Sequence, residues 1–218
     1  HRPPGQALEA LPRPDAVLVS HNHYDHLDLA TLRRLADMGA PPVVTGLGNA
    51  PLVRRSGLRD VTELDWWQSH DLPGGHRITY LPMRHGSARN MRDACHALWG
   101  GFAIETAGGA RLFFCGDTAW GPHLQEIGDR LGPFDVALVP IGAYEPRWFM
   151  NTVHMNPDEA MLAHHALRAR TSIAMHFGVF KLTREPVDEP EARVVSRPLV
   201  FTPRIAEAHH QSHRIPIP

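Results

Sequence analysis

The chain has 218 residues, of which 43% are hydrophobic, enough for the core of one domain or of two small ones. Its formal net charge of −1 argues against a nucleic-acid-binding protein, and its two cysteines exclude a disulfide scaffold and favour two buried free thiols. No apolar run reaches the roughly 20 residues of a membrane span and no signal peptide follows His1, so we expect a cytoplasmic protein.

Strands and helices alternate along the first part of the chain. The run "DAVLVS" (15–20) predicts a buried strand that leads directly into a histidine-rich loop, "SHNHYDHLD", which begins at residue 20. The elements expected next are, in chain order, a helix at 28–38, a strand at 41–45, a helix at 50–55, and strands at 61–64 and 77–83. This alternation favours a sheet covered by helices.

A hairpin interrupts the alternation in the second part of the chain. Its arms are expected at 98–106 and 111–117, around the Gly-Gly pair at 108–109. The elements after it are a helix at 122–131, a strand at 134–143, a helix that begins with "NPDEA", and a strand at 172–176. In "NPDEA", Asn156 can cap the helix and Glu159 completes a capping box. The sheet system is therefore predicted to be mixed, with helices outside.

The histidine loop carries side chains that bind zinc-class metals. In H-x-H-x-D-H, His21 and His23 are two residues apart, which places both on one face of an extended segment. Asp25 and His26 follow after the chain has begun to turn, so they can point to a second position nearby. One ion does not comfortably take four ligands from six residues. The spacing therefore predicts two adjacent ions.

Two ions need more ligands than one loop provides. His85, Asp117 and His176 each follow a predicted strand, and strand ends on one edge of a sheet converge on one crevice. Gly116 in "GDT" allows a tight turn that frees the Asp117 carboxylate to bridge two ions. We therefore predict that these three residues complete the site.

This ligand pattern resembles that of the metallo-β-lactamase superfamily. Further segments resemble its branch related to N-acyl-phosphatidylethanolamine-hydrolysing phospholipase D, over about residues 15–185: "RHGSARN", "LWGGF", "FFCGDT", "GPFDVALVPIGAYEPRWFM", "NPDEA" and "AMHFGVF". The resemblance implies an α/β fold, the αββα metallo-β-lactamase sandwich. It implies a hydrolase domain at 1–185. The many prolines and the lack of a sustained period at 186–218 predict an irregular C-terminal tail there.

The resemblance also implies roles for the predicted ligands. One metal would be held by His21, His23 and His85, the second by Asp25, His26 and His176, with Asp117 between them. The cofactors would be two divalent ions, zinc first, with manganese and iron as alternatives for these nitrogen and oxygen ligands. A metal-bridged hydroxide would be the nucleophile, with Asp25 and Asp117 as catalytic residues that hold or orient it.

The predicted reaction is phosphodiester hydrolysis, like that of a phospholipase D, on an N-acyl phospholipid or a related molecule. A lactone or amide hydrolase is the first alternative, and a metal-binding fragment without activity is the second. Candidates for substrate contact are His154, Tyr144 and Arg89. The expected partner is a small-molecule or lipid substrate, not nucleic acid; peripheral membrane contact and homo-oligomerisation stay open.

The sequence departs from the family pattern at three places. Family members place several strands before the histidine loop, whereas one strand is predicted here, so we expect the sandwich to be incomplete on its N-terminal side and to expose an apolar edge or face. Gly86 stands where an aromatic residue is expected. The tail does not resemble the elements that usually close the fold. These departures affect stability and substrate binding more than metal ligation.

Overall fold

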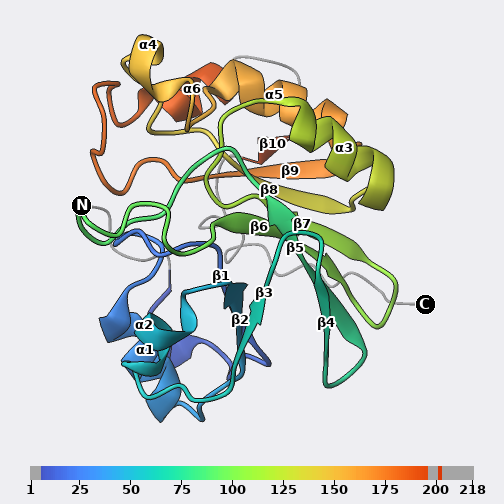
Figure 1. Cartoon of the computed structure of the whole chain (residues 1–218). Helices are drawn as coiled ribbons and strands as arrows, with labels where there is room; N and C mark the ends of the chain where they lie inside the picture. The colour runs from blue at the N-terminus through green and yellow to red at the C-terminus, as the bar shows by residue number, and fades with distance from the viewer. Residues whose placement is uncertain (1–5, 196–200, 203–218) are drawn as a thin grey trace.

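The computed structural model describes residues 6–195 and 201–202, which form two β-sheets packed face to face with helices outside (Figure 1). The small sheet contains three parallel strands, in the order β1 (Val17–Val19), β2 (Val43–Gly46) and β3 (Val61–Leu64). The large sheet is mixed, in the order β10 (Phe201–Thr202), β9 (Thr171–Met175), β8 (Val136–Pro140), β7 (Arg111–Phe114), β6 (Gly100–Glu105), β5 (His76–Pro82) and β4 (Ser69–Leu72).

The helices cover the two outer sides of the sandwich. The segments before and beside the small sheet are η1 (Leu8–Ala10), α1 (Leu29–Asp37) and α2 (Ala50–Arg54). Those on the far side of the large sheet are α3 (Pro122–Leu131), α4 (Arg147–Met150), α5 (Pro157–Ala166) and α6 (Glu189–Val195). Among the described residues, no helix has the length and apolar character needed to cross a membrane.

Apolar side chains form three clusters that correspond to these layers. Val19 and Val53 belong to the cluster that joins the small sheet to α1 and α2. Tyr80 and Phe102 lie in the cluster between the sheets, and Leu124 belongs to the largest one, between the large sheet and the helices. Each sheet therefore buries one face against the other sheet and one against helices, and the predicted αββα sandwich is confirmed.

The local signals for the main elements are confirmed with small shifts in their ends. Asn156 accepts from the backbone N–H of Glu159 at 2.9 Å, and the Glu159 side chain accepts from the N–H of Asn156 at 2.8 Å, so the predicted capping box is formed. The hairpin turns at Gly109, whose φ is +82°. Such signals are visible in sequence because they depend on neighbouring residues.

Other elements escaped the sequence prediction. Strand β4 has the polar sequence "SHDL" and forms only through its pairing with β5. Helix α6 and strand β10 lie within 186–218, which we expected to be irregular, because the many prolines there concealed a seven-residue helix. Cys115 is a buried free thiol as predicted, but Cys95 is exposed. The remaining tail, 196–200 and 203–218, lies outside the described residues.

The sheets also bear on the prediction of an incomplete N-terminal side. Strand β1 lies at one edge of the small sheet, and Leu18 is only partly buried. Ile104 and Phe114 of the large sheet are partly buried as well, although they pack against the cluster between the sheets. That further strands belong beside β1 stays a prediction.

Candidate metal centre

The strand directions bring distant parts of the sequence to one end of the sandwich. Strands β5 and β7 both pair antiparallel with β6, and β7, β8 and β9 are parallel, so β5, β7, β8 and β9 point the same way. His85, Asp117 and His176 follow β5, β7 and β9, and the histidine loop follows β1. Their side chains therefore meet at the carboxyl ends of the strands.

The backbone is fixed tightly where the loop leaves β1. The Tyr80 hydroxyl and the backbone N–H of Gly100 both donate to the carbonyl of Ser20, at 2.8 and 3.0 Å. Gly116 has a φ of +64°, and a Cβ there would lie 2.7 Å from the carbonyl oxygen of Gly100. The predicted tight turn before Asp117 is confirmed, and only glycine fits it without a shift.

The predicted ligands form two groups whose nitrogen and oxygen atoms could each hold one metal ion. The first contains His21, His23 and His85, and the second contains Asp25, His26, Asp117 and His176. Within each group the candidate ligand atoms all lie within 4.8 Å of one another. All seven residues predicted from the sequence therefore belong to one cluster.

Asp117 lies between the two groups. Its Oδ2 is 3.0 Å from Nε2 of His26 and 3.3 Å from Nε2 of His176, in the second group. The same oxygen is 4.0 Å from Nε2 of His21 and 3.7 Å from Nε2 of His85, in the first group. One carboxylate therefore faces both groups, which is the arrangement that a bridging ligand needs.

The hydrogen bonds around the cluster turn imidazole lone pairs toward its centre. Nδ1 of His85 donates to the carbonyl of Val153 at 3.0 Å, which leaves the lone pair of the neutral ring on Nε2, 3.1 Å from Nδ1 of His23. Asp117 Oδ1 is buried and has no hydrogen-bond partner among the described residues. Converging lone pairs and a buried, unpartnered carboxylate oxygen fit divalent cations.

Burial sets the protonation of the first group. It lowers the pKa of His21 well below its ordinary value, with a further lowering from the nearby His26. The pKa values of His23 and His85 are also lowered, again mainly by burial. These three imidazoles are therefore neutral at pH 7 and can act as ligands without losing a proton.

The second group behaves in the opposite way. Burial by itself lowers the pKa of His26, but hydrogen bonds and charges from Asp117 and Asp25 outweigh it and raise this pKa to about 10. The pKa of His176 is raised too, since the charge of Asp117 and the hydrogen bond that His176 donates to Asp25 exceed the effect of burial. The pKa values of both carboxyls are lowered by the two histidines despite burial.

The three candidates for substrate contact lie in different settings. His154 is buried beside the cluster, with its ring centroid 4.9 Å from that of His85, and burial lowers its pKa to about 4. Tyr144 is fully buried and its hydroxyl donates to Glu189 at 2.8 Å, so that hydroxyl is engaged by α6. Arg89 contacts the histidine loop itself. Together with His85 and Asp117, His154 forms a third group of close nitrogen and oxygen atoms that could hold a metal ion.

An apolar cavity adjoins the second group. It has a volume of about 170 Å³ and is lined by Asp25, His176 and the apolar side chains of Phe177, Val179, Phe180 and Leu182. Phe180 and Leu182 are 49% and 53% exposed. An apolar surface therefore lies directly beside the side chains of Asp25 and His176.

One supporting residue was not singled out from the sequence. The Thr118 hydroxyl accepts from the backbone N–H of Arg84 at 2.9 Å and lies 3.0 Å from Nε2 of His123. It thus joins the turn after Asp117 to the turn before His85. The signal was present in "GDT", but its meaning depends on a contact between residues 34 positions apart.

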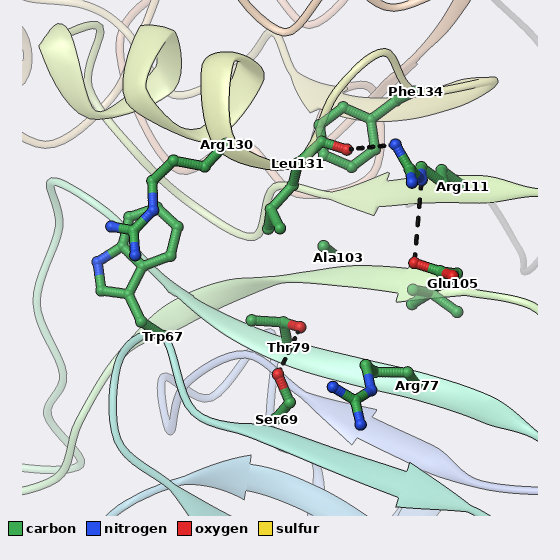
Figure 2. Close-up of a pocket in the computed structure, with 11 residues that line it drawn as sticks. Trp67, Ser69, Arg77, Thr79, Ala103, Glu105, Arg111, Arg130, Leu131 and Phe134 are labelled. Carbon is green, nitrogen blue, oxygen red and sulfur yellow. Dashed lines mark hydrogen bonds and ion pairs between the residues drawn. The ribbon is translucent and has the colours of Figure 1, made fainter.

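A larger cavity lies away from this cluster, on the outer face of β4 to β7 (Figure 2). It measures about 350 Å³ and has none of the seven predicted ligands in its lining. Its polar side chains satisfy one another: Ser69 and Thr79 are 2.9 Å apart, and Arg130 stacks 3.8 Å above the Trp67 ring. We interpret it as the part of the outer sheet face that α3 leaves open to solvent.

Comparison with known proteins identifies the family of the chain. Residues 1–177 match the model of the family described as "Beta-lactamase superfamily domain". The chain is 40% identical over 206 residues to N-acyl-phosphatidylethanolamine-hydrolyzing phospholipase D 1 of Caenorhabditis elegans, covering 89% of this chain and 57% of that protein. It thus spans little more than half the length of that relative.

Two further similarities extend this picture. The chain is 30% identical over 169 residues to a metal-dependent hydrolase of Rubrobacter xylanophilus, covering 76% of this chain and 65% of the relative. The solved structure of Igni18, a metallo hydrolase from Ignicoccus hospitalis, superposes with a TM-score of 0.65 at 24% identity, covering 87% of this chain and 74% of Igni18. That structural match supports the fold alone.

Proposed function

The chain belongs to the metallo-β-lactamase superfamily, and on that basis we propose that it is a dinuclear metal-dependent hydrolase of phosphodiesters. The observation that carries the proposal is the Asp117 carboxylate, whose Oδ2 lies within 4.0 Å of imidazole nitrogens from both ligand groups. A carboxylate between two sets of ligands supports a pair of ions rather than a single one.

The ligand chemistry supports zinc as the resident metal, with manganese and iron as alternatives. His21, His23 and His85 would hold one ion; Asp25, His26 and His176 would hold the other, with Asp117 shared. Imidazole nitrogens and carboxylate oxygens suit all three metals, and histidine-rich sites are common for zinc. Elemental analysis of the purified protein identifies the ion.

Such ions, when bound, activate water for attack at neutral pH and offset the negative charge of the attacked group. Residues of the chain then supply the proton handling and orientation. Asp25 is the more exposed of the two carboxylates and stays ionised, so it can accept a hydrogen bond from the attacking water. His154 is neutral at pH 7 and can donate one ring N–H to a substrate oxygen.

Two observations favour a lipid-like phosphodiester. The apolar cavity beside Asp25 and His176 can accommodate part of an acyl chain. The relative from Caenorhabditis elegans bears a name that states hydrolysis of N-acyl-phosphatidylethanolamine. Lactone or amide hydrolysis remains the alternative in the same superfamily, because an activated water also attacks carbonyl carbon.

The first experiment measures hydrolysis of bis-(p-nitrophenyl) phosphate and of N-acyl-phosphatidylethanolamine in mixed micelles by protein loaded with zinc or manganese. We expect turnover that His23→Ala abolishes. A panel of lactones under the same conditions tests the alternative. Two bound ions per chain without turnover of any phosphodiester would refute the proposal.

The inactive-fragment alternative needs a separate measurement. Thermal melts with and without zinc report whether the ligand groups bind metal in the folded chain, because binding to the native state raises the melting temperature. A raised melting temperature without hydrolysis would favour the metal-binding fragment. An unchanged melting temperature, together with no metal in elemental analysis, would remove the basis for both the hydrolase and the metal-binding fragment.

A further inference from the structure

We propose that Arg89 is a positioning residue that clamps the histidine loop and thereby sets the affinity of the metal groups. This inference rests on the proposed function in one respect only, since it takes the two groups to be metal sites. It changes the sequence-based expectation that Arg89 contacts the substrate. The argument comes from the contacts of its guanidinium group.

One terminal nitrogen of Arg89 spans the loop that carries four of the predicted ligands. Nη1 donates to the carbonyl of Asn22 at 3.1 Å and to the carbonyl of Leu27 at 2.8 Å. This nitrogen has two hydrogens, so each carbonyl can receive its own. Asn22 lies between the first two loop histidines, and Leu27 directly follows the last. The clamp therefore joins both ends of the loop.

A second contact holds the guanidinium in place. Its central carbon lies 3.6 Å from the centroid of the Tyr24 ring, which is a cation–π contact. Tyr24 lies in the same loop, between His23 and Asp25, and is 68% exposed. The ring therefore covers one face of the guanidinium, and Arg89 contacts the loop at its middle as well as near both ends.

The backbone of Arg89 is itself anchored. Its N–H donates to Asp93 Oδ1 at 2.9 Å, and the N–H of Asn90 donates to the same oxygen at 2.8 Å. These bonds lower the pKa of Asp93 and keep it an acceptor. The clamp thus extends from an anchored turn, four residues after His85, to the loop. It connects the His85 segment to the other ligands of the first group.

The surroundings of Arg89 argue against a direct contact with substrate at the metals. The cavity that Arg89 and Tyr24 line has a volume of about 560 Å³, and its lining includes none of the seven predicted ligands. The Arg89 guanidinium donates two hydrogen bonds to backbone carbonyls, and the Tyr24 ring covers one of its faces. Its influence on the site is therefore expected to pass through the loop backbone.

The test measures zinc affinity by competition with a chromophoric chelator, which needs no substrate. Arg89→Met removes the donors and keeps the side-chain length; we expect zinc affinity to fall roughly 10–100-fold, as for other residues that orient metal ligands. Arg89→Lys keeps a donor without the planar stack and should recover part of the affinity. Arg77→Met, at a surface ion pair with Asp71, is the control and should leave it unchanged.

Two further measurements distinguish positioning of the histidine loop by Arg89 from a direct contact between Arg89 and the substrate. In the cobalt-substituted protein, a displaced loop changes the visible absorption bands, which a substrate contact does not. If phosphodiester turnover is found, positioning lowers kcat with KM nearly constant, whereas a substrate contact raises KM. Tyr24→Leu, at an exposed position, gives a second variant that weakens the clamp if Arg89→Met does not fold.

The proposal is overturned if folded Arg89→Met or Tyr24→Leu binds both zinc ions within twofold of the parent protein. It is also overturned if Arg89→Met lowers only the melting temperature of the metal-free protein, which is a purely structural effect. Loss of affinity in a protein without any hydrolytic activity would support the clamp and refute the phosphodiesterase. The two proposals can therefore fail separately.

Discussion

Metal binding should release very different numbers of protons from the two ligand groups. The first group, His21, His23 and His85, has lowered pKa values and has no protons to lose at pH 7. In the second, His26 has a pKa of about 10 and so carries a proton that coordination must remove, and the pKa of His176 is raised as well. Filling the second group should therefore release at least one proton from its histidines, and filling the first about none.

The pKa of His26 sets the size of the pH effect on metal affinity. Its proton must be removed about three pH units below its pKa, which costs roughly 4 kcal/mol at pH 7. The affinity of the second group should therefore rise about tenfold per pH unit for each proton released, until the pH passes the pKa of that histidine. The affinity of the first group should be nearly independent of pH above 7.

Calorimetric titration with zinc in PIPES, HEPES and Tris at pH 7 measures this directly. The observed enthalpy, plotted against the ionisation enthalpy of the buffer, has a slope equal to the number of protons released. His26→Gln should reduce that slope by about one proton, while His21→Gln should leave the release by the second group unchanged. Equal proton release from both binding events would refute the assignment of charge to the two groups.

Three other predictions concern the support of the site. Gly116→Ala should lower the free energy of unfolding, measured in urea, by about 2–4 kcal/mol. The added Cβ would strain the left-handed backbone and lie 2.7 Å from the carbonyl oxygen of Gly100. An unchanged midpoint of unfolding would contradict this. Tyr80→Phe removes the hydrogen bond to the Ser20 carbonyl and should lower the free energy of unfolding by about 1–3 kcal/mol. An unchanged free energy would mean that the carbonyl finds another donor. Asn156→Ala removes the N-cap of α5 and should cost about 1 kcal/mol without changing zinc affinity; a large loss of affinity would show that the cap also orients the site.

The same charges predict how the metal-free protein responds to pH. The pKa of His26 is raised above its unfolded value, so its contribution to stability is complete below about pH 6.5 and is lost as the pH rises through about 10. The pKa of Asp117 is lowered, so its contribution is present above about pH 4 and is lost in acid. A fall in melting temperature in alkali that His26→Gln removes would verify the first part.

The sequence prediction succeeded for features that depend on interactions between residues close together in the chain. The spacing of His21 and His23, the capping box at Asn156 and the tight turn at Gly116 each depend on residues within a few positions, and all are found in the structure. Strand β4 failed because its polar sequence becomes a strand only when β5 lies beside it. Periodicity within a segment does not reveal such pairing.

The sequence by itself determined which side chains can bind metal and that they follow strands. Only the tertiary structure decided the distances from Asp117 to the two ligand groups, the hydrogen bond from Tyr144 to Glu189, and the hydrogen bonds from Arg89 to the histidine loop. The reason is that distances within a segment follow from bond geometry. Distances between segments instead depend on how two sheets and their helices pack, and that packing is specified by the whole chain together.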